Sequence, residues 1–228
     1  MKTLKDYLAF SEKHPALFVN PPQGGFAILL QEDEIRDAEA QMVQKLRDAS
    51  LPTEWAQVGI VYQDQYVLLL RDAVCFPDGS LGTYIRSIHD EDTAPGVIIL
   101  PVWQGKVLLL RHFRHATRTW HLEIPRGFGE KGYTTEENAR RELYEELKAT
   151  PSHLVELGKV YPDTGMTSEC DELFFAEVEA YGNAEAQEAI AEILPTAVPE
   201  FEHMLRENEI TDGFTLTAYA RAKLRGLL

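Results

Sequence analysis

Apolar residues change their spacing along the chain, and each change predicts a different element. The segment QEDEIRDAEAQMVQKLRDAS (31–50) carries apolar residues at helical spacing, at Ile35, Ala38, Met42 and Leu46. From residue 56 short apolar runs bounded by turn residues take over. AQVGIVY and QYVLLLRD predict a hairpin, and the turn-rich FPDGSLG precedes a predicted strand, TYIRSI. PGVIILPV and KVLLLRHF, joined at 103–105, are continuously apolar, as is typical of strands buried on both faces.

The second half of the chain continues this mixture of strands and helices. Strands are predicted at 155–161, 172–178 and 188–194, and two helices are predicted at roughly 198–208 and 213–226. The order favours an α+β fold, in which helices cover a mixed β-sheet, over a regular βαβ repeat. We expect two parts: a region of helix and antiparallel strands at 1–90, and a larger domain at 91–228.

Between these halves lies a glycine-rich segment followed by an acidic helix, PRGFGEKGYTTEENARRELYEELKAT (125–150). Thr134 and Glu137 match a T-x-x-E capping box, so the helix is expected to begin near Thr135. Residues 127–132, with three glycines, are expected to form a loop whose backbone can approach a ligand closely. An apolar stripe then predicts the face of the helix that packs on the sheet: Ala139, Leu143 and Leu147.

The carboxylates of this helix gather beside the apolar stripe. Glu142 and Glu146 are four residues apart and share a face, while Glu145 lies within one turn of Glu142. Arg141 is four residues before Glu145 and can pair with it. Two interpretations are open at this point: a solvated acidic face, or a cation site. Hard carboxylate oxygens suit Mg²⁺, which commonly bridges to substrate phosphates.

Bulk composition limits the possible partners. The formal net charge of −15 argues against non-specific binding to nucleic acid or an anionic membrane, and it means that an anionic substrate needs a metal or an arginine cluster. Two cysteines fit a reducing compartment better than a disulfide framework. No signal-peptide core and no apolar run of membrane-spanning length is present in the sequence, so we expect a cytoplasmic protein.

The acidic helix and the segment before it resemble the Nudix box, usually written G-x5-E-x7-R-E-U-x-E-E-x-G-U with U aliphatic. Gly127 and the run Arg141-Glu142-Leu143-x-Glu145-Glu146 match at the required spacing. Two positions depart: Tyr133 stands at the expected glutamate, and Lys148 at the glycine near the end. HFRHATRTWHLEIPRG (112–127), YPDTGMTSE (161–169) and ENEITDGFTLTAYARAKL (207–224) are similar to segments of the ADP-ribose pyrophosphatase branch, the first to a run ending E-L-P-A-G.

The resemblance implies roles for individual residues. Glu142, Glu145 and Glu146 match metal carboxylates, and Arg141 matches the arginine that holds this cluster by salt bridging. The carbonyl of Arg126 matches a backbone metal ligand, and Arg126 is also expected at the substrate-binding site. Arg114 matches a contact to the substrate phosphates, and Glu123 matches the glutamate of E-L-P-A-G, with either a structural or a substrate role. Glu169 lies in the loop segment, where it serves as a substrate-binding residue or a loop cap.

The general base is the least defined part of this site. Aligning the acidic segment AEAQEAIAEI places Glu188 on a metal-binding glutamate, and the usual base position then falls on Ala186. Either Glu185 serves as the base, or Glu145 or Glu169 orients the attacking water. The aromatics Trp120, Phe128 and Tyr133 are open to base stacking, core packing or a dimer contact.

Taken together, the resemblance implies a Nudix-type α/β/α sandwich with a small N-terminal region. It implies hydrolysis of the diphosphate in ADP-ribose or a related nucleotide sugar, with Mg²⁺ as cofactor and Mn²⁺ as an alternative. For ADP-ribose the products are AMP and ribose 5-phosphate. It also implies a homodimer with residues 1–90 at the interface. Two alternatives are a Nudix hydrolase for another nucleoside diphosphate derivative, such as NADH, and a weakened domain that binds nucleotides as a sensor.

Overall fold

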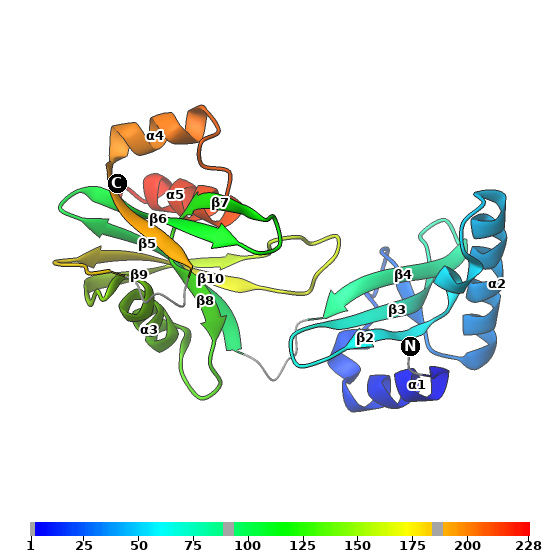
Figure 1. The fold of residues 1–228 in the computed structure, drawn as a ribbon. Helices are drawn as coiled ribbons and strands as arrows, with labels where there is room; N and C mark the ends of the chain where they lie inside the picture. The colour runs from blue at the N-terminus through cyan, green and yellow to red at the C-terminus, as the bar shows by residue number, and fades with distance from the viewer. Residues whose placement is uncertain (1–2, 89–93, 184–188) are drawn as a thin grey trace. The chain divides into compact units, whose positions relative to one another are not determined.

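The computed structural model describes residues 3–88, 94–183 and 189–228, and these fall into two compact units. Unit 1 comprises residues up to 90 together with 163–168, and unit 2 comprises 91–162 and 169–228 (Figure 1). The segment 163–168 therefore groups with the N-terminal unit, although the sequence placed it in the larger domain. Its grouping has a direct cause, because the Ser87 N–H donates to the carbonyl of Met166 at 2.8 Å.

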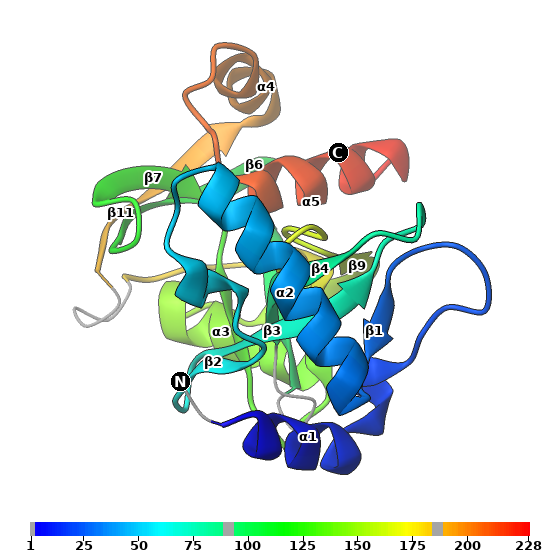
Figure 2. The ribbon, with the colours of Figure 1, turned by 90° about the vertical axis from the view of Figure 1, so that its right-hand side faces the viewer.

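Unit 1 is built around a small antiparallel sheet. Its central strand β3 (Leu68–Cys75) pairs with β4 (Leu81–Ile88) on one side, and with β1 (Ala27–Leu29) and β2 (Gly59–Gln63) on the other. The predicted helix is α2 (Glu32–Asp48), which packs against β3 and β4 (Figure 2). Short 3₁₀ turns at Pro15–Phe18 and Thr53–Ala56 complete the unit.

The first helix of unit 1, α1 (Leu4–Lys13), did not emerge from the apolar pattern. Its start carries a complete capping box, in which Thr3 and Asp6 exchange side-chain and backbone hydrogen bonds. The helix is anchored by Tyr7, which is fully buried and donates its hydroxyl to Asp72 at 2.6 Å. Arg86 pairs with the same carboxylate at 2.6 Å, so a buried polar network, rather than an apolar stripe alone, fixes α1.

Unit 2 contains a mixed sheet of seven strands. The main path runs β11-β6-β5-β10-β9, with β7 paired to β6 and β8 to β5. The strands are β5 (Ala94–Trp103), β6 (Lys106–Arg114), β7 (Thr119–Glu123), β8 (Arg126–Gly129), β9 (Pro151–Val160), β10 (Asp171–Val178) and β11 (Ile190–Ala197). β5 and β10 are parallel, whereas the other pairs are antiparallel. Gln104 and Gly105 both have positive φ, which allows the tight turn between β5 and β6.

The central strands of this sheet are buried on both faces, which explains their continuous apolar runs. Along β5, Ile98 and Leu100 point into one core cluster, whereas Val97 and Ile99 point into the other. The first cluster is covered by α4 (Val198–Arg206) and α5 (Gly213–Leu224), the second by α3 (Thr135–Leu147) (Figure 1). The arrangement is an α/β/α sandwich, so the predicted fold class is confirmed.

The expected glycine loop differs from the prediction. Its first residues belong to strand β8, which pairs antiparallel with β5, and the loop before α3 is correspondingly shorter. Gly129 makes this pairing possible, because a Cβ there would overlap the carbonyl oxygen of Pro95. Close packing of β8 on β5 therefore explains one of the three glycines. None of the helices in the described residues is both long and apolar enough to cross a membrane.

Candidate active site

Helix α3 carries the predicted carboxylates on a well-capped scaffold. Thr134 accepts a hydrogen bond from the Glu137 N–H, and the Glu137 carboxylate accepts one from the Thr134 N–H in return, as the capping box predicts. At the other end Lys148 has φ of 50°, the left-handed conformation that usually favours glycine. The helix thus keeps the geometry of the box while a lysine occupies its glycine position.

Arg141 is held on the outer side of the helix by a residue that the sequence pattern did not single out. Its guanidinium makes a two-pronged contact with Glu130, with both N–O distances at 2.6 Å. A second carboxylate, that of Glu145, lies 3.8 Å away, and the guanidinium stacks over the ring of Tyr133. Glu130 therefore provides a carboxylate for Arg141 close to Tyr133, where the box has its usual glutamate.

Glu142 and Glu146 lie on the inner side of the helix, against strand β8. The Glu142 carboxylate sits directly over Gly127, where a Cβ would overlap it. Glu146 is only 3% exposed and accepts a hydrogen bond from the Arg126 N–H at 3.2 Å. Burial, followed by repulsion from Glu142, raises the pKa of Glu146 to about 8. A buried carboxyl next to a second carboxylate is an environment that a divalent cation would stabilise.

A second buried carboxylate, Glu123 at the end of β7, is in the opposite situation. It forms ion pairs with Arg114 and, at 3.5 Å, with Arg126, and Nδ1 of His112 lies 3.1 Å from its carboxylate. Burial alone would raise the pKa of Glu123, but the hydrogen bonds of His112 and Arg114 and the two arginine charges together lower it. Arg126 also pairs with Asp212 at 3.2 Å. This network joins β6, β7 and β8 to the start of α5.

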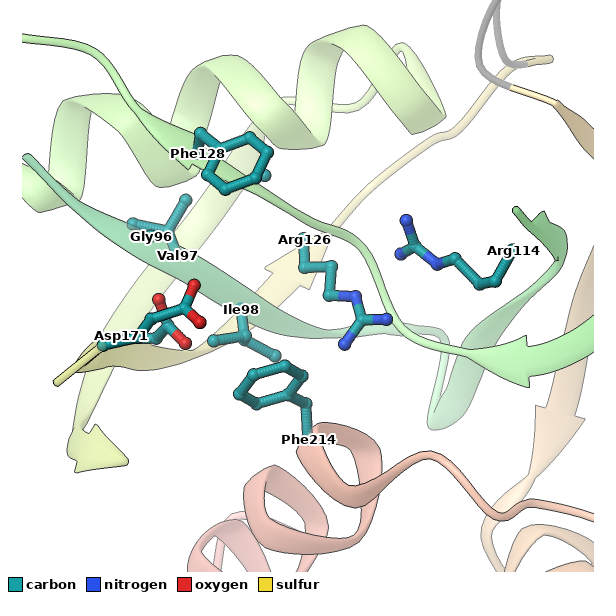
Figure 3. Close-up of a pocket in the computed structure, with 10 residues that line it drawn as sticks. Gly96, Val97, Ile98, Arg114, Arg126, Phe128, Asp171 and Phe214 are labelled. Carbon is teal, nitrogen blue, oxygen red and sulfur yellow. The ribbon is translucent and has the colours of Figure 1, made fainter. Parts of the chain in front are cut away.

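A cavity of about 230 Å³ opens beside this network. Arg114 and Arg126 line one part of it, and Glu169 and Asp171 line another. The rest of the lining comprises a backbone stretch of β5, Gly127 and two aromatic rings, Phe128 and Phe214. Figure 3 shows Arg126 next to Phe214, with Asp171 away from the two arginines. The cavity is therefore positive in one part and acidic in another.

The structure brings some of the predicted site residues together and separates others. Glu142 adjoins Gly127, Glu146 adjoins the backbone of Arg126, and Arg114, Arg126 and Glu169 line the cavity. Glu145 is half exposed and faces Arg141. Glu188 and the candidate base Glu185 lie outside the described residues. Within the described ranges, no three His, Cys, Asp or Glu side chains are arranged as a ready-made metal cage. His112 faces Glu123, and His121 contacts Thr117.

Several residues of the site were missed by sequence reasoning. Asp171 is 4% exposed and packs against Gly96, where a Cβ would overlap its carboxylate. Asp212 caps α5 by accepting bonds from the Thr215 N–H and hydroxyl. The D-x-x-T spacing could have revealed this cap, but its pairing with Arg126 depends on tertiary structure. Phe128, whose role the sequence left open, is 77% exposed, which excludes core packing in unit 2.

Chemically, the arrangement places two neighbouring carboxylates, Glu142 and Glu146, against strand β8, whose residues Arg126 and Gly127 also line the cavity that contains Arg114. Neighbouring carboxylates that repel each other favour a hard divalent cation, and arginines favour phosphate oxygens. A site of this composition on a fold of helices over a mixed sheet is chemically suited to metal-assisted phosphate chemistry.

Comparisons with known proteins identify the family. The NUDIX domain model matches residues 92–212, just over half of the chain, so the chain belongs to the NUDIX family. An ADP-ribose pyrophosphatase of Bacillus subtilis (strain 168) is 27% identical over 129 residues, covering 55% of this chain and 69% of the relative. A crystal structure of an ADP compounds hydrolase superposes with a TM-score of 0.65 at 19% identity, covering 75% of this chain and 93% of that one. The family prediction and the prediction of a Nudix-type pyrophosphohydrolase are confirmed.

Proposed function

We propose that the chain is a Mg²⁺-dependent hydrolase that cleaves the diphosphate of ADP-ribose or a closely related nucleotide sugar, giving AMP and ribose 5-phosphate from ADP-ribose. The observation that carries the proposal is the buried Glu146 carboxyl beside Glu142, which lies over Gly127, a residue that also lines the cavity with Arg114 and Arg126. The similarity to an ADP-ribose pyrophosphatase supports the choice of substrate.

The donor set fits a magnesium ion. Mg²⁺ is usually held by one or two carboxylates, with waters and substrate phosphates completing its coordination. Glu142 and Glu146 supply the carboxylates, and Gly127 leaves the space that a side chain would fill. Glu145, Glu188 and the carbonyl of Arg126 are the further ligands implied by the Nudix resemblance. When bound, the ion supplies charge neutralisation at the phosphates and a more acidic water. Mn²⁺ has the same oxygen preference and is expected to substitute.

Residues of the chain then have separate roles in substrate binding and in positioning the carboxylates. Arg114, anchored by Glu123, presents its guanidinium to the cavity and binds phosphate oxygens. Arg141, locked on Glu130, holds the outer side of the helix so that Glu142 and Glu146 face β8. The buried position of Glu146 reduces the water around the reacting centre, which strengthens each of these electrostatic contacts. Glu169 is placed at the cavity to contact substrate.

We also propose that the protein works as a homodimer in which residues 1–90 contribute to the interface. Unit 1 carries an exposed aromatic group that supports this proposal. Phe26 contacts Phe76 edge-to-face and Tyr84 in a tilted arrangement, with ring centroids 5.0 and 5.5 Å apart. Sedimentation velocity of the purified chain tests the assembly, and a monomer at micromolar concentration would refute it.

The function is tested by incubating the protein with Mg²⁺ and a panel comprising ADP-ribose, NADH, other nucleotide sugars and ADP. Release of AMP from ADP-ribose, lost on chelation and restored by Mg²⁺, is the expected result. Glu146→Gln should lower turnover on the order of 10³-fold or more while the fold is kept. Glu136→Gln, an exposed glutamate on the same helix, is the matched control and should leave turnover unchanged. Absence of turnover on every compound would overturn the proposal.

A further inference from the structure

The side chain of Arg126 has no role in the metal site, yet it is one of the best-anchored groups at the cavity. Its backbone N–H contacts helix α3, where it donates a hydrogen bond to Glu146. The related E-L-P-A-G run has alanine at this position, so the guanidinium is a distinctive feature of the present chain.

Three contacts from two elements hold the guanidinium in place. One terminal nitrogen pairs with Asp212 at 3.2 Å, and the other lies 3.5 Å from Glu123. The group stacks over the Phe214 ring with 4.8 Å to the ring centroid. Its side chain remains 23% exposed. An arginine has five N–H donors, and two carboxylate contacts leave donors for a ligand in the cavity. The side chain is therefore fixed in advance of binding and still able to donate.

The cavity to which Arg126 contributes has a definite polarity. Arg114 and Arg126 provide donors in one part, whereas Glu169 and Asp171 provide acceptors in another. Phe128 and Phe214 supply apolar walls. A volume of about 230 Å³ is below the usual range for a drug-sized ligand, so it suits one half of a nucleotide sugar rather than the whole molecule.

We propose that this cavity binds the sugar-phosphate half of the substrate and that Arg126 is a specificity-determining residue that binds its phosphate. The inference rests on the proposed function for the identity of the whole substrate, but the cavity's ligand is assigned from its own chemistry. Phosphate oxygens match the guanidinium donors of Arg126 and Arg114. Sugar hydroxyls are donors and match the acceptor oxygens of Asp171 and Glu169.

A nucleobase matches the same cavity less well. Adenine presents ring nitrogens that accept hydrogen bonds alongside its amino group, whereas ionised carboxylates can only accept. With the base at Asp171 and Glu169, the amino group could donate to a carboxylate, but the ring nitrogens beside it would set acceptors against acceptors. A sugar has hydroxyl donors on several carbons, and its C–H faces can lie against Phe128 and Phe214. The polar groups of the cavity therefore favour the sugar over the base.

Direct binding tests this assignment without depending on turnover. Ribose 5-phosphate, inorganic phosphate, ribose and AMP are titrated into the intact protein by calorimetry. The wild type should bind ribose 5-phosphate more tightly than phosphate or ribose. Arg126→Ala should weaken ribose 5-phosphate and phosphate by about 10- to 100-fold, the range for hydrogen bonds to a charged group. Arg126→Lys should recover part of this loss. Arg36→Ala, which removes an exposed arginine from α2, should change nothing.

A second variant separates ligand contact from a purely structural role of Arg126. Asp171→Asn should weaken ribose 5-phosphate but leave phosphate binding as in the wild type, because only the sugar contact is altered. A clamp-only role would lower thermal stability in Arg126→Ala and leave the affinity for ribose 5-phosphate unchanged, which would overturn the inference. Tighter binding of AMP than of ribose 5-phosphate, equally sensitive to Asp171→Asn, would also overturn it.

These results can be told apart from failure of the proposed function. If ribose 5-phosphate binding depends on Arg126 while ADP-ribose is not hydrolysed, the cavity assignment stands and the proposed activity falls. If ADP-ribose is hydrolysed and Arg126→Ala does not alter ribose 5-phosphate affinity, the activity stands and the cavity assignment falls.

Discussion

Two glutamates in unit 2 are almost equally buried, yet their ionisation is shifted in opposite directions. Glu123 is 1% exposed and Glu146 is 3% exposed. Burial outweighs every other influence on Glu146 and raises its pKa to about 8. At Glu123 the hydrogen bonds from His112 and Arg114, with the charges of Arg114 and Arg126, outweigh burial and lower the pKa. The pKa shifts differ in direction because Glu123 has more positively charged and hydrogen-bonding neighbours than Glu146.

This contrast separates a carboxylate whose charge the folded chain balances from one that, under the proposed function, a metal ion balances. Glu123 has its cations within the protein, so its charge is balanced when the chain folds. At Glu146 the charge of Arg114 and the hydrogen bond from the Arg126 N–H do not offset burial and repulsion from Glu142, so a bound cation would be needed to balance its charge. Carboxyls of the same type and depth can thus be assigned to stability or to function by their neighbours.

The largest effect should follow from removing the balanced carboxylate. Glu123→Ala removes a buried carboxylate and leaves the partly buried Arg114 and Arg126 without their common partner, so we expect the free energy of unfolding to fall by about 3 kcal/mol. Urea denaturation followed by circular dichroism measures the loss. Glu136→Ala, an exposed glutamate in an i,i+4 pair, should cost no more than about 0.5 kcal/mol. Similar losses in the two variants would show that the Glu123 network does not stabilise the fold.

The glycine beneath the Glu142–Glu146 pair should be the next most sensitive position. Gly127→Ala forces the added Cβ into the Glu142 carboxylate, and such overpacking should cost about 1–3 kcal/mol of stability. Displacement of Glu142 should also reduce turnover by about 100-fold. Gly213→Ala is the control, because its Cβ would meet open space. Unimpaired hydrolysis in Gly127→Ala would argue against Glu142 at the reacting centre.

The pH dependence of metal-free protein should expose the charge of Glu146 directly. The folded-state pKa of Glu146 is raised above its usual value of 4.5, so ionisation at about pH 8 costs the folded state while the unfolded chain ionises freely. Stability from this group therefore decreases as pH rises from about 4.5 to about 8. Glu146→Gln cannot ionise and should melt a few degrees above wild type at about pH 9, but close to it at about pH 5.

Addition of Mg²⁺ provides a check on the expected difference in melting temperature between the wild type and Glu146→Gln. Added Mg²⁺ should stabilise the wild type at about pH 9 more than Glu146→Gln, because it neutralises a carboxylate that the variant lacks. Scanning calorimetry with and without a chelator measures both effects. A melting difference that is independent of pH would contradict burial and repulsion from Glu142 as the cause of the raised pKa.

The smallest effect is expected at the C-terminal end of α3, where the substitution changes neither Glu123 nor Glu146. Lys148 adopts φ of 50°, and glycine accepts this conformation at lower cost. Lys148→Gly should raise stability by about 0.5–1 kcal/mol without altering turnover. Lys148→Ala keeps the backbone strain while removing the side chain, so it should not produce the gain. Equal stabilisation by both variants would assign the effect to the lysine side chain.

Much of this architecture is readable from local patterns. The apolar runs around Ile98 and Leu108 predicted strands buried on two faces, because both faces of the sheet are covered by helices. The start of α3 followed from the Thr134 capping box, since a cap depends on residues only three positions apart. The spacing of Glu142 and Glu146 likewise placed them on one helical face.

What escaped prediction depends on contacts between distant segments. The strand character of 126–129 arises from pairing with β5, whose partner residues lie about thirty positions earlier. Asp212 and Arg126 are 86 residues apart, and no local pattern links them. The partner of Arg141 proved to be Glu130, because the turn before the helix brings that residue back onto it. The α1 helix was overlooked even though Thr3 and Asp6 form a local cap.

The two-sided attachment of Arg126 has a thermodynamic consequence. Its backbone N–H bonds to Glu146, while its guanidinium faces the cavity beside α5. A cation at Glu146 and a phosphate at the guanidinium would therefore act on the same short strand, β8. If occupancy of one changes the affinity of the other, reciprocity requires an equal factor in the reverse direction. Titration of ribose 5-phosphate at increasing Mg²⁺ concentrations would measure this coupling between cation binding and phosphate binding, which Arg126 contacts through its backbone and its side chain respectively.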